Sequence, residues 1–139
     1  MKKRVLFLCT HNSCRSQMAE GLVNADLGER FQAFSAGTVA TVVNPLAVRV
    51  LAEIGIDISG HYSKTLKAFA GQEFDQVITL CGSANESCLL YVGGVRRVHL
   101  GFDDPSGGTG TDEELLPEFR RVRDRIRREI ALYLEGATS

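Results

Sequence analysis

The chain has 139 residues, a length typical of one domain, and 44% of them are hydrophobic, so it can bury a core without disulfides or metals. Its formal net charge of -1 argues against bulk attraction to nucleic acid or to an acidic membrane surface. The apolar run after the basic N-terminus ends at Thr10, too early for a signal peptide, and no run approaches the about 20 apolar residues of a membrane span. We therefore expect a single domain over residues 1–139, located in the cytoplasm, with no nucleic-acid or membrane partner.

Strands and helices are predicted to alternate along the chain. The continuous apolar run at residues 4–9 is typical of a strand buried inside a parallel sheet. The next predicted elements are a helix over 16–27, a strand over 31–36, a helix over 45–54 capped by Asn44 and a short helix over 63–69 capped by Ser63. After these come strands over 75–80 and 96–100, a glycine-rich loop over 101–111 and a helix from 112 or 117 to 134. This order predicts a three-layer α/β fold, in which a four-stranded parallel sheet is flanked by helices on both faces.

The last predicted helix combines an apolar stripe with a dense run of arginines. Apolar residues recur at spacings of three and four, which predicts a core-facing stripe made of Phe119, Val122, Ile126, Ile130 and Tyr133. The arginines are interpreted as a solvated face paired with acidic neighbours on the same helix, namely Glu118, Asp124 and Glu129.

Residues 9–16, CTHNSCRS, join the first predicted strand to the first predicted helix. In open α/β sheets, ligands bind beyond the carboxyl ends of the strands, and a helix N-terminus attracts anions. The planar fork of Arg15 suits a tetrahedral oxyanion, and the same field favours a thiolate at Cys9. The segment therefore predicts an oxyanion cradle above a cysteine nucleophile. The plainer alternative is a buried strand end followed by a surface arginine.

Two further cysteines, Cys81 and Cys88, are separated by the small polar segment GSANES. Cys81 follows a predicted strand, on the same side of the sheet as Cys9, so the pair could exchange disulfides with it. Other readings are plain buried thiols, structural disulfides, or a zinc site that includes Cys14. The zinc reading is disfavoured because the spacing between Cys81 and Cys88 is looser than in structural sites.

The motif CTHNSCRSQMAEG resembles the phosphate-binding loop of the low-molecular-weight protein tyrosine phosphatase fold. It resembles more closely the arsenate reductases of that fold, which draw electrons from thioredoxin. The match continues in order, over nearly the whole chain, through FSAGT, VNP, DISGHYS, VITLCGSANESC, GFDDP and FRRVRDRI. The resemblance implies a monomeric, single-domain arsenate reductase that serves arsenic detoxification, with thioredoxin as electron donor and no bound cofactor.

The resemblance also implies a sequence of thiol steps. Cys9 attacks the arsenic of bound arsenate while Asp104 acts as general acid. Cys81 then attacks Cys9, arsenite leaves, and Cys88 attacks Cys81. Thioredoxin reduces the resulting Cys81–Cys88 disulfide, and thioredoxin reductase with NADPH returns thioredoxin to its reduced form. The arsenate would be held by the loop residues Thr10, His11, Asn12, Ser13, Cys14, Arg15 and Ser16.

The general acid is assigned within the motif GFDDP. Asp104 precedes Pro105, and an Asp-Pro pair is also a common turn former. The resemblance aligns the residue before the proline, so Asp104 is preferred to Asp103.

Some relatives bind potassium near this loop, and Asn12, Glu20 and Ser35 match that site. Lys64 stands where those relatives have an aspartate, and a lysine cannot ligate a cation. The resemblance therefore predicts a vestigial potassium site without a metal, in which the Lys64 ammonium replaces the ion and pairs with Glu20. Otherwise Lys64 is simply an exposed helix residue.

Three competing functions remain open. A low-molecular-weight protein tyrosine phosphatase would use Cys9, Arg15 and Asp104 identically. It would leave Cys81 and Cys88 without a role, and the loop after Asp104 offers no aromatic residue for a tyrosine ring. Weak phosphatase side activity is nevertheless expected because the cradle is shared. An oxyanion-binding or redox-sensing module would bind without turnover, and a reductase could instead take electrons from a low-molecular-weight thiol with a glutaredoxin-like protein.

Overall fold

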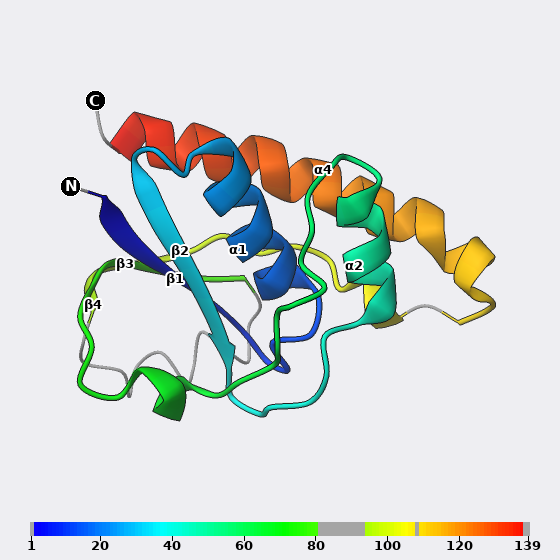
Figure 1. Cartoon of the computed structure of the whole chain (residues 1–139), viewed down its shortest axis with the longest axis horizontal. Helices are drawn as coiled ribbons and strands as arrows, with labels where there is room; N and C mark the ends of the chain where they lie inside the picture. Colours follow the sequence, from blue (N-terminus) through cyan, green and yellow to red (C-terminus); the bar gives the residue numbers. More distant parts are fainter. Residues whose placement is uncertain (1, 81–93, 108, 138–139) are drawn as a thin grey trace.

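The computed structural model describes residues 2–80, 94–107 and 109–137. Its sheet has four parallel strands, as the sequence predicted, and their spatial order is β2-β1-β3-β4 (Figure 1). The strands are β1 (Lys3–Cys9), β2 (Phe31–Gly37), β3 (Phe74–Thr79) and β4 (Gly94–His99). Because all four run the same way, their carboxyl ends meet at one edge, where Cys9 of β1 pairs with Gly37 of β2.

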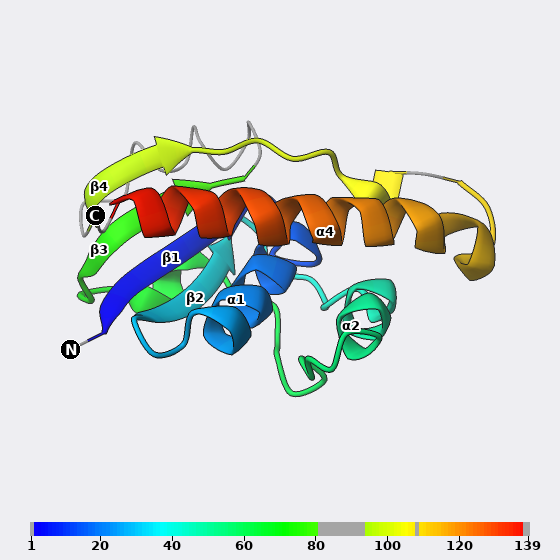
Figure 2. The ribbon, with the colours of Figure 1, turned by 90° about the horizontal axis from the view of Figure 1, so that it is seen from above.

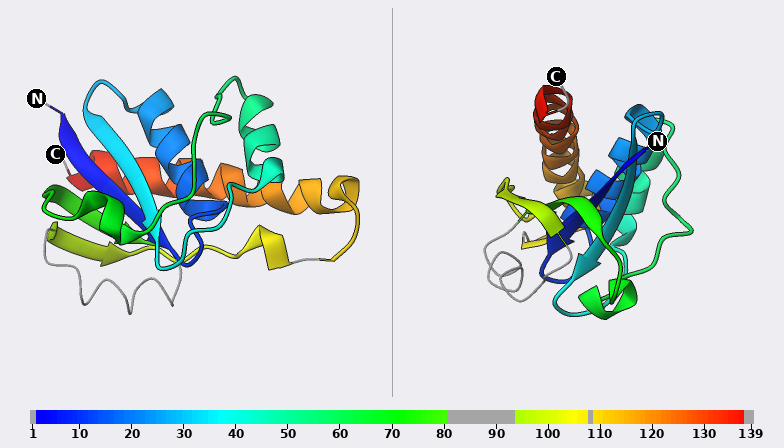
Figure 3. Two further views of the ribbon diagram at one scale, coloured as in Figure 1. Left: turned by 60° about the horizontal axis from the view of Figure 1, so that its bottom comes forward. Right: turned by 90° about the vertical axis from the view of Figure 1, so that its left-hand side faces the viewer.

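Helical segments cover both faces of the sheet. The helices α1 (Arg15–Asp26), α2 (Pro45–Ala52) and α4 (Asp112–Ala137) pack with alternate residues of β1, from Val5 to Cys9, in the larger core cluster. The 3-10 helix η1 (Leu66–Phe69) packs on the opposite face, against a smaller cluster. Figures 2 and 3 show α4 and η1 on opposite sides of the strands. The predicted three-layer α/β class is confirmed.

Two helix starts illustrate how local chemistry sets the elements. The Asn44 side chain accepts a hydrogen bond of 2.9 Å from the backbone N–H of Leu46, which confirms the predicted cap of α2. The predicted cap at Ser63 is wrong. Its hydroxyl donates to the backbone carbonyl of His11 at 2.8 Å, and η1 begins only at Leu66. Ser63 therefore fastens one loop to another rather than starting a helix.

The C-terminal helix α4 extends beyond its apolar stripe at both ends. It begins at Asp112 and contains Pro117, and four of the five predicted stripe residues are buried, namely Phe119, Val122, Ile126 and Ile130. Within the described residues, no helix has the length and apolar character needed to cross a membrane.

The arginines of α4 do more than the predicted solvated face. Pairs within the helix are present, such as Arg125 with Glu129 at 3.0 Å. Arg123, however, is only 8% exposed and donates to the backbone carbonyl of Val50 and to Glu53 beside α2. The predicted pairing with Glu118, Asp124 and Glu129 is confirmed. The predicted solvated position is wrong for Arg123, which joins α4 to α2.

Candidate functional site

The loop over residues 10–14 connects β1 to α1 at the carboxyl edge of the sheet. Its backbone carbonyls are directed at neighbouring segments. The Thr10 carbonyl accepts from the N–H of Thr38 at 2.9 Å, and the Ser13 carbonyl accepts from the N–H of Asn44 at 2.9 Å. These hydrogen bonds turn the two carbonyls toward neighbouring segments, an arrangement compatible with an anion-binding nest.

Gly37, the last residue of β2, allows the loop to lie directly on the strand end. A Cβ atom at this position would lie 2.7 Å from the Thr10 carbonyl oxygen and 2.8 Å from the backbone nitrogen of Asn12. These are backbone atoms, so no side-chain rotation could relieve the clash. A glycine is therefore needed for this close approach.

Asn12 holds the loop in its curved shape. Its φ angle of 51° lies in the left-handed region, which asparagine tolerates better than most residues, and the residue is fully buried. Its side-chain carbonyl accepts from Gln17 Nε2 at 2.8 Å and from the backbone N–H of Lys64 at 3.0 Å. Its amide donates to Ser16 Oγ at 2.8 Å. These side-chain contacts brace the loop against α1 and Lys64.

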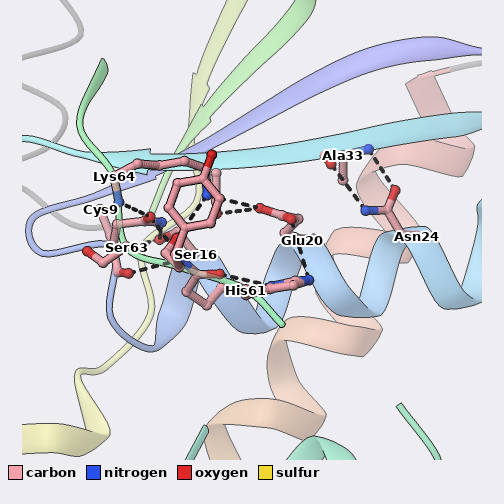
Figure 4. A network of polar contacts seen from close by, with 12 residues as sticks. Cys9, Ser16, Glu20, Asn24, Ala33, His61, Ser63 and Lys64 are labelled. Carbon is pink, nitrogen blue, oxygen red and sulfur yellow. Dashed lines mark hydrogen bonds and ion pairs between the residues drawn. The ribbon is translucent and has the colours of Figure 1, made fainter. Parts of the chain in front are cut away.

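The sulfur of Cys9 lies at the bottom of this loop, 2.8 Å from Ser16 Oγ (Figure 4). Asn12 already donates to the same Ser16 oxygen, so the hydroxyl proton of Ser16 is available for the sulfur. Cys9 is 2% exposed and sits below the N-terminus of α1. A hydroxyl donor together with a helix N-terminus stabilises negative charge on a cysteine sulfur.

Arg15, the first residue of α1, is buried with an incomplete set of partners. Its Nη1 donates to the Phe102 carbonyl at 3.2 Å, and its Nη2 lies 3.5 Å from an Asp104 carboxylate oxygen. Its Nε is buried and has no hydrogen-bond partner among the described residues. A buried donor without an acceptor is unfavourable, so this atom is suited to a bound oxyanion. The alternative of a surface arginine is wrong, because Arg15 is only 9% exposed.

Asp104 is the acidic group that reaches this loop. Its carboxylate accepts from the Ser106 backbone N–H at 2.9 Å and from the Ser106 hydroxyl at 2.6 Å. Partial burial by itself raises the pKa of Asp104, but the hydrogen bonds from Ser106 and the charge of Arg15 outweigh it and hold the pKa below its ordinary value. Asp104 is therefore ionised near neutral pH.

Cys14 completes the lining of the loop. Its sulfur lies 3.6 Å from an Asp104 carboxylate oxygen, and the residue is 4% exposed. Burial, reinforced by the charge of Asp104, raises the pKa of the Cys14 thiol to about 12. Cys14 is thus a neutral thiol near neutral pH and adds no negative charge to the loop.

Two residues of the predicted vestigial potassium site, Ser35 and Lys64, contact Glu20, and Asn12 accepts from the backbone N–H of Lys64. Figure 4 shows Glu20 with Lys64 and His61 beside it. Ser35 donates to a Glu20 carboxylate oxygen at 2.5 Å, the Lys64 ammonium lies 3.9 Å from the same oxygen, and His61 lies 3.6 Å from the other. The Lys64 side chain is 12% exposed, so the alternative of an exposed helix residue is wrong. Burial lowers the pKa of Lys64, and the charge of Glu20 opposes this change.

Sequence reasoning did not single out Gln17, which connects three parts of the site. Its amide donates to Asn12 and to the Tyr62 carbonyl at 3.0 Å, and its carbonyl oxygen lies 3.0 Å from His61 Nδ1. No periodic signal marks this residue, because the first turns of α1 are buried on every side. Of the predicted relay, only Cys9 lies within the described residues, and Cys81 and Cys88 lie outside them.

Comparisons with known proteins identify the family of the chain. Residues 4–137 match the family model of the low molecular weight phosphotyrosine protein phosphatases. The chain is 50% identical to an arsenate reductase of Halalkalibacterium halodurans over 96% of both sequences. A solved arsenate reductase in the phosphate binding state matches 98% of both chains with a TM-score of 0.80 and 32% identity. A thioredoxin-dependent arsenate reductase of Corynebacterium glutamicum matches with a TM-score of 0.66 and 27% identity, over 98% of this chain and 63% of that one. The chain therefore belongs to the low molecular weight phosphotyrosine protein phosphatase family, and it is similar over almost its whole length to arsenate reductases.

Proposed function

We propose that this chain is a thioredoxin-dependent arsenate reductase, a single catalytic domain that acts in the cytoplasm in arsenic detoxification. The observation that carries the proposal is the buried Nε of Arg15, which has no hydrogen-bond partner among the described residues and lies at the end of the loop that follows Cys9. A tetrahedral oxyanion would complete the hydrogen bonding of Arg15 and lie above the nucleophile. The 50% identity to an arsenate reductase supports arsenate as that oxyanion.

The first step is attack of the Cys9 thiolate on arsenic(V). A sulfur–arsenic bond forms and an arsenic–oxygen bond breaks, so the departing oxygen needs a proton. Asp104 is the nearest candidate donor, since its carboxylate lies beside Arg15 and Cys14. A bound oxyanion would engage Arg15 and add negative charge, which raises the pKa of Asp104 and lets it take up a proton together with the substrate.

The second step moves two electrons to arsenic. In the proposed relay, the Cys81 thiolate attacks the Cys9 sulfur, the sulfur–arsenic bond breaks with its electron pair on arsenic, and arsenite leaves. Cys88 then attacks Cys81 and releases Cys9 as a thiolate, and the dithiol of thioredoxin reduces the Cys81–Cys88 disulfide. Three cysteines in this chain and the thioredoxin dependence of the C. glutamicum neighbour support this scheme.

The proposal is tested by following NADPH oxidation with arsenate, thioredoxin and thioredoxin reductase. We expect sustained turnover by the wild-type chain. Cys88→Ser should release a single equivalent of arsenite and then stop, because its Cys9–Cys81 disulfide has no intramolecular thiol to resolve it. Cys14→Ser is not a suitable control because Cys14 lines the cradle, so Ser139→Ala, at the far end of the chain, is preferred. Absence of arsenate turnover by the wild type, alongside strong hydrolysis of phosphate esters, would identify a phosphatase instead.

Phosphate ester hydrolysis is the second candidate activity, favoured by the match to the phosphatase family model. Cys9, Arg15 and Asp104 would perform it without the other cysteines. We expect this activity to be weak, and it should be unchanged in Cys88→Ser. That independence separates the shared cradle from the reductase relay.

We also expect turnover to be nearly independent of the choice between potassium and sodium. The Lys64 ammonium lies 3.9 Å from Glu20, where it supplies the positive charge that an ion would otherwise bring. Turnover in matched chloride salts should be about equal, and Lys64→Asp should create stimulation by potassium. Lys67→Asp, at an exposed position of η1, is the matched control. A several-fold stimulation of the wild type by potassium would contradict this role of Lys64.

A further inference from the structure

The adjacent residues Asp103 and Asp104 are held by different parts of the molecule. Asp104 lies 3.5 Å from Arg15 in the oxyanion loop. Asp103 accepts a hydrogen bond of 2.8 Å from Arg121 on α4. Since the two residues are adjacent in the chain, holding the Asp103 carboxylate on α4 limits where the backbone of Asp104 can lie.

Phe102 anchors the same segment one residue earlier. Its side chain is 7% exposed, its N–H donates to the Leu80 carbonyl at 3.1 Å, and its carbonyl accepts from Arg15. The Arg125 guanidinium of α4 lies 5.7 Å from the centre of the Phe102 ring. The segment is therefore attached to the sheet, to the oxyanion loop and to α4 immediately before Asp104.

Arg121 itself is held in place by a second carboxylate. Glu118, one turn earlier on α4, accepts hydrogen bonds from both Arg121 Nε and Nη2. The contact with Glu118 thus fixes the orientation in which the Arg121 guanidinium donates to Asp103. These contacts hold the pKa of Asp103 below its ordinary value, first through the hydrogen bond from Arg121 and then through its charge.

We propose that Arg121 is a positioning residue that, through Asp103, aims Asp104 at the oxyanion loop. This inference rests on the proposed function, in which Asp104 is the general acid. Proton transfer requires the donor within hydrogen-bonding reach of the departing oxygen, and small displacements reduce its efficiency. The ion pair between Arg121 and Asp103 lies at the surface, where such pairs contribute little to folding stability. Its main effect in this proposal is on the alignment of Asp104.

The same helix provides a matched control. Arg127 forms a comparable pair with Asp26, at 2.7 Å from Nε and 2.9 Å from Nη2. The exposed fraction of its side chain is 44%, against 45% for Arg121. Arg127, however, joins α4 to the end of α1 and has no contact with the segment that carries Asp104.

The first experiment compares arsenate turnover of the full-length wild type with that of Arg121→Gln, Arg127→Gln and Asp104→Asn. We expect Arg121→Gln to lower kcat by about tenfold and Asp104→Asn by about 100-fold, with KM nearly unchanged in Arg121→Gln. Arg127→Gln should resemble the wild type. In the Asp104→Asn background, Arg121→Gln should cause no further loss, because the group that it positions is already absent.

Other outcomes distinguish failure of the general-acid role of Asp104 from failure of the positioning role of Arg121. If Asp104→Asn keeps full turnover, the general-acid assignment fails. If Asp104→Asn loses turnover but Arg121→Gln does not, or if the two losses multiply in the double variant, the positioning role of Arg121 fails. Equal losses in Arg121→Gln and Arg127→Gln would also overturn it, since they would reflect a general effect on α4.

The pKa of Asp104 provides a second test of the proposal, which does not depend on turnover. Carbon-13 NMR of the Asp104 carboxyl should show its pKa rising in Arg121→Gln as the group moves away from Arg15. Asp103→Asn should raise the same pKa, although removing a nearby negative charge by itself lowers the pKa of a carboxyl. An unchanged pKa in Arg121→Gln, or a lowered pKa in Asp103→Asn, would overturn the positioning role.

Discussion

Replacement of Cys9 by serine should abolish arsenate reduction, with turnover falling by more than about 10⁴-fold. The Cys9 sulfur is the group that the loop surrounds, 2.8 Å from the Ser16 hydroxyl and 2% exposed. A serine oxygen is similar in size but cannot form a disulfide, so it has no way to pass electrons to arsenic. The measurement is arsenite formation, both in the coupled NADPH assay and in a single turnover.

The control for this variant is oxyanion binding. Cys9→Ser leaves Arg15 and the loop amides in place, so phosphate should still bind when measured by calorimetry, and thermal unfolding should change little. Arsenite formation that persists in a folded Cys9→Ser chain would show that another cysteine is the nucleophile. Loss of phosphate binding together with activity would show that the substitution had disturbed the loop rather than the chemistry.

Replacement of Arg15 by lysine should lower kcat/KM for arsenate by about 100- to 1000-fold. Lysine keeps the positive charge but not the planar fork, which donates to the Phe102 carbonyl and leaves Nε for the oxyanion. The loss would therefore measure the geometry of the guanidinium rather than its charge. Steady-state kinetics with arsenate and calorimetry with phosphate should show parallel effects.

Arg120→Lys is the matched control for Arg15→Lys. Arg120 also makes a forked contact, with its Nε at 3.0 Å and its Nη2 at 2.7 Å from the Glu53 carboxylate, but it lies on α4 outside the site. We expect Arg120→Lys to keep wild-type kcat/KM. If Arg15→Lys also kept it, the clamp assigned to Arg15 would be refuted.

Much of the fold could be predicted because its signals are local. The continuous apolar run of β1, the Asn44–Pro45 start of α2 and the stripe from Phe119 to Ile130 each lie within a few residues. Each pattern expresses the burial or capping of its own segment. Errors occurred where a side chain was assigned a local role but contacts a distant segment. Ser63 binds the His11 carbonyl, and Arg123 binds the Val50 carbonyl.

The candidate site was predictable to the same extent. Cys9 and Arg15 stand at the two ends of one strand–loop–helix connection, so their proximity follows from chain connectivity and the known behaviour of α/β sheets. The assignment of Asp104 came from a family resemblance, and the structure adds a contact with Cys14, which is 90 positions away. Gln17 and the Phe102 carbonyl have no sequence signal, because their partners come from other segments of the chain. Gln17 contacts His61 and Tyr62, and the Phe102 carbonyl accepts from Arg15.

The sequence by itself determined the class of fold, the oxyanion loop and its cysteine, because short-range burial patterns and the order of the elements specify them. Only the tertiary structure decided how deeply Lys64 is buried, that Gln17 contacts His61, and that Arg121 holds Asp103. These features depend on which side chains meet after segments far apart in the chain have packed together. Hydrophobic periodicity records whether a residue is buried, but it does not record the partner that its polar atoms will find.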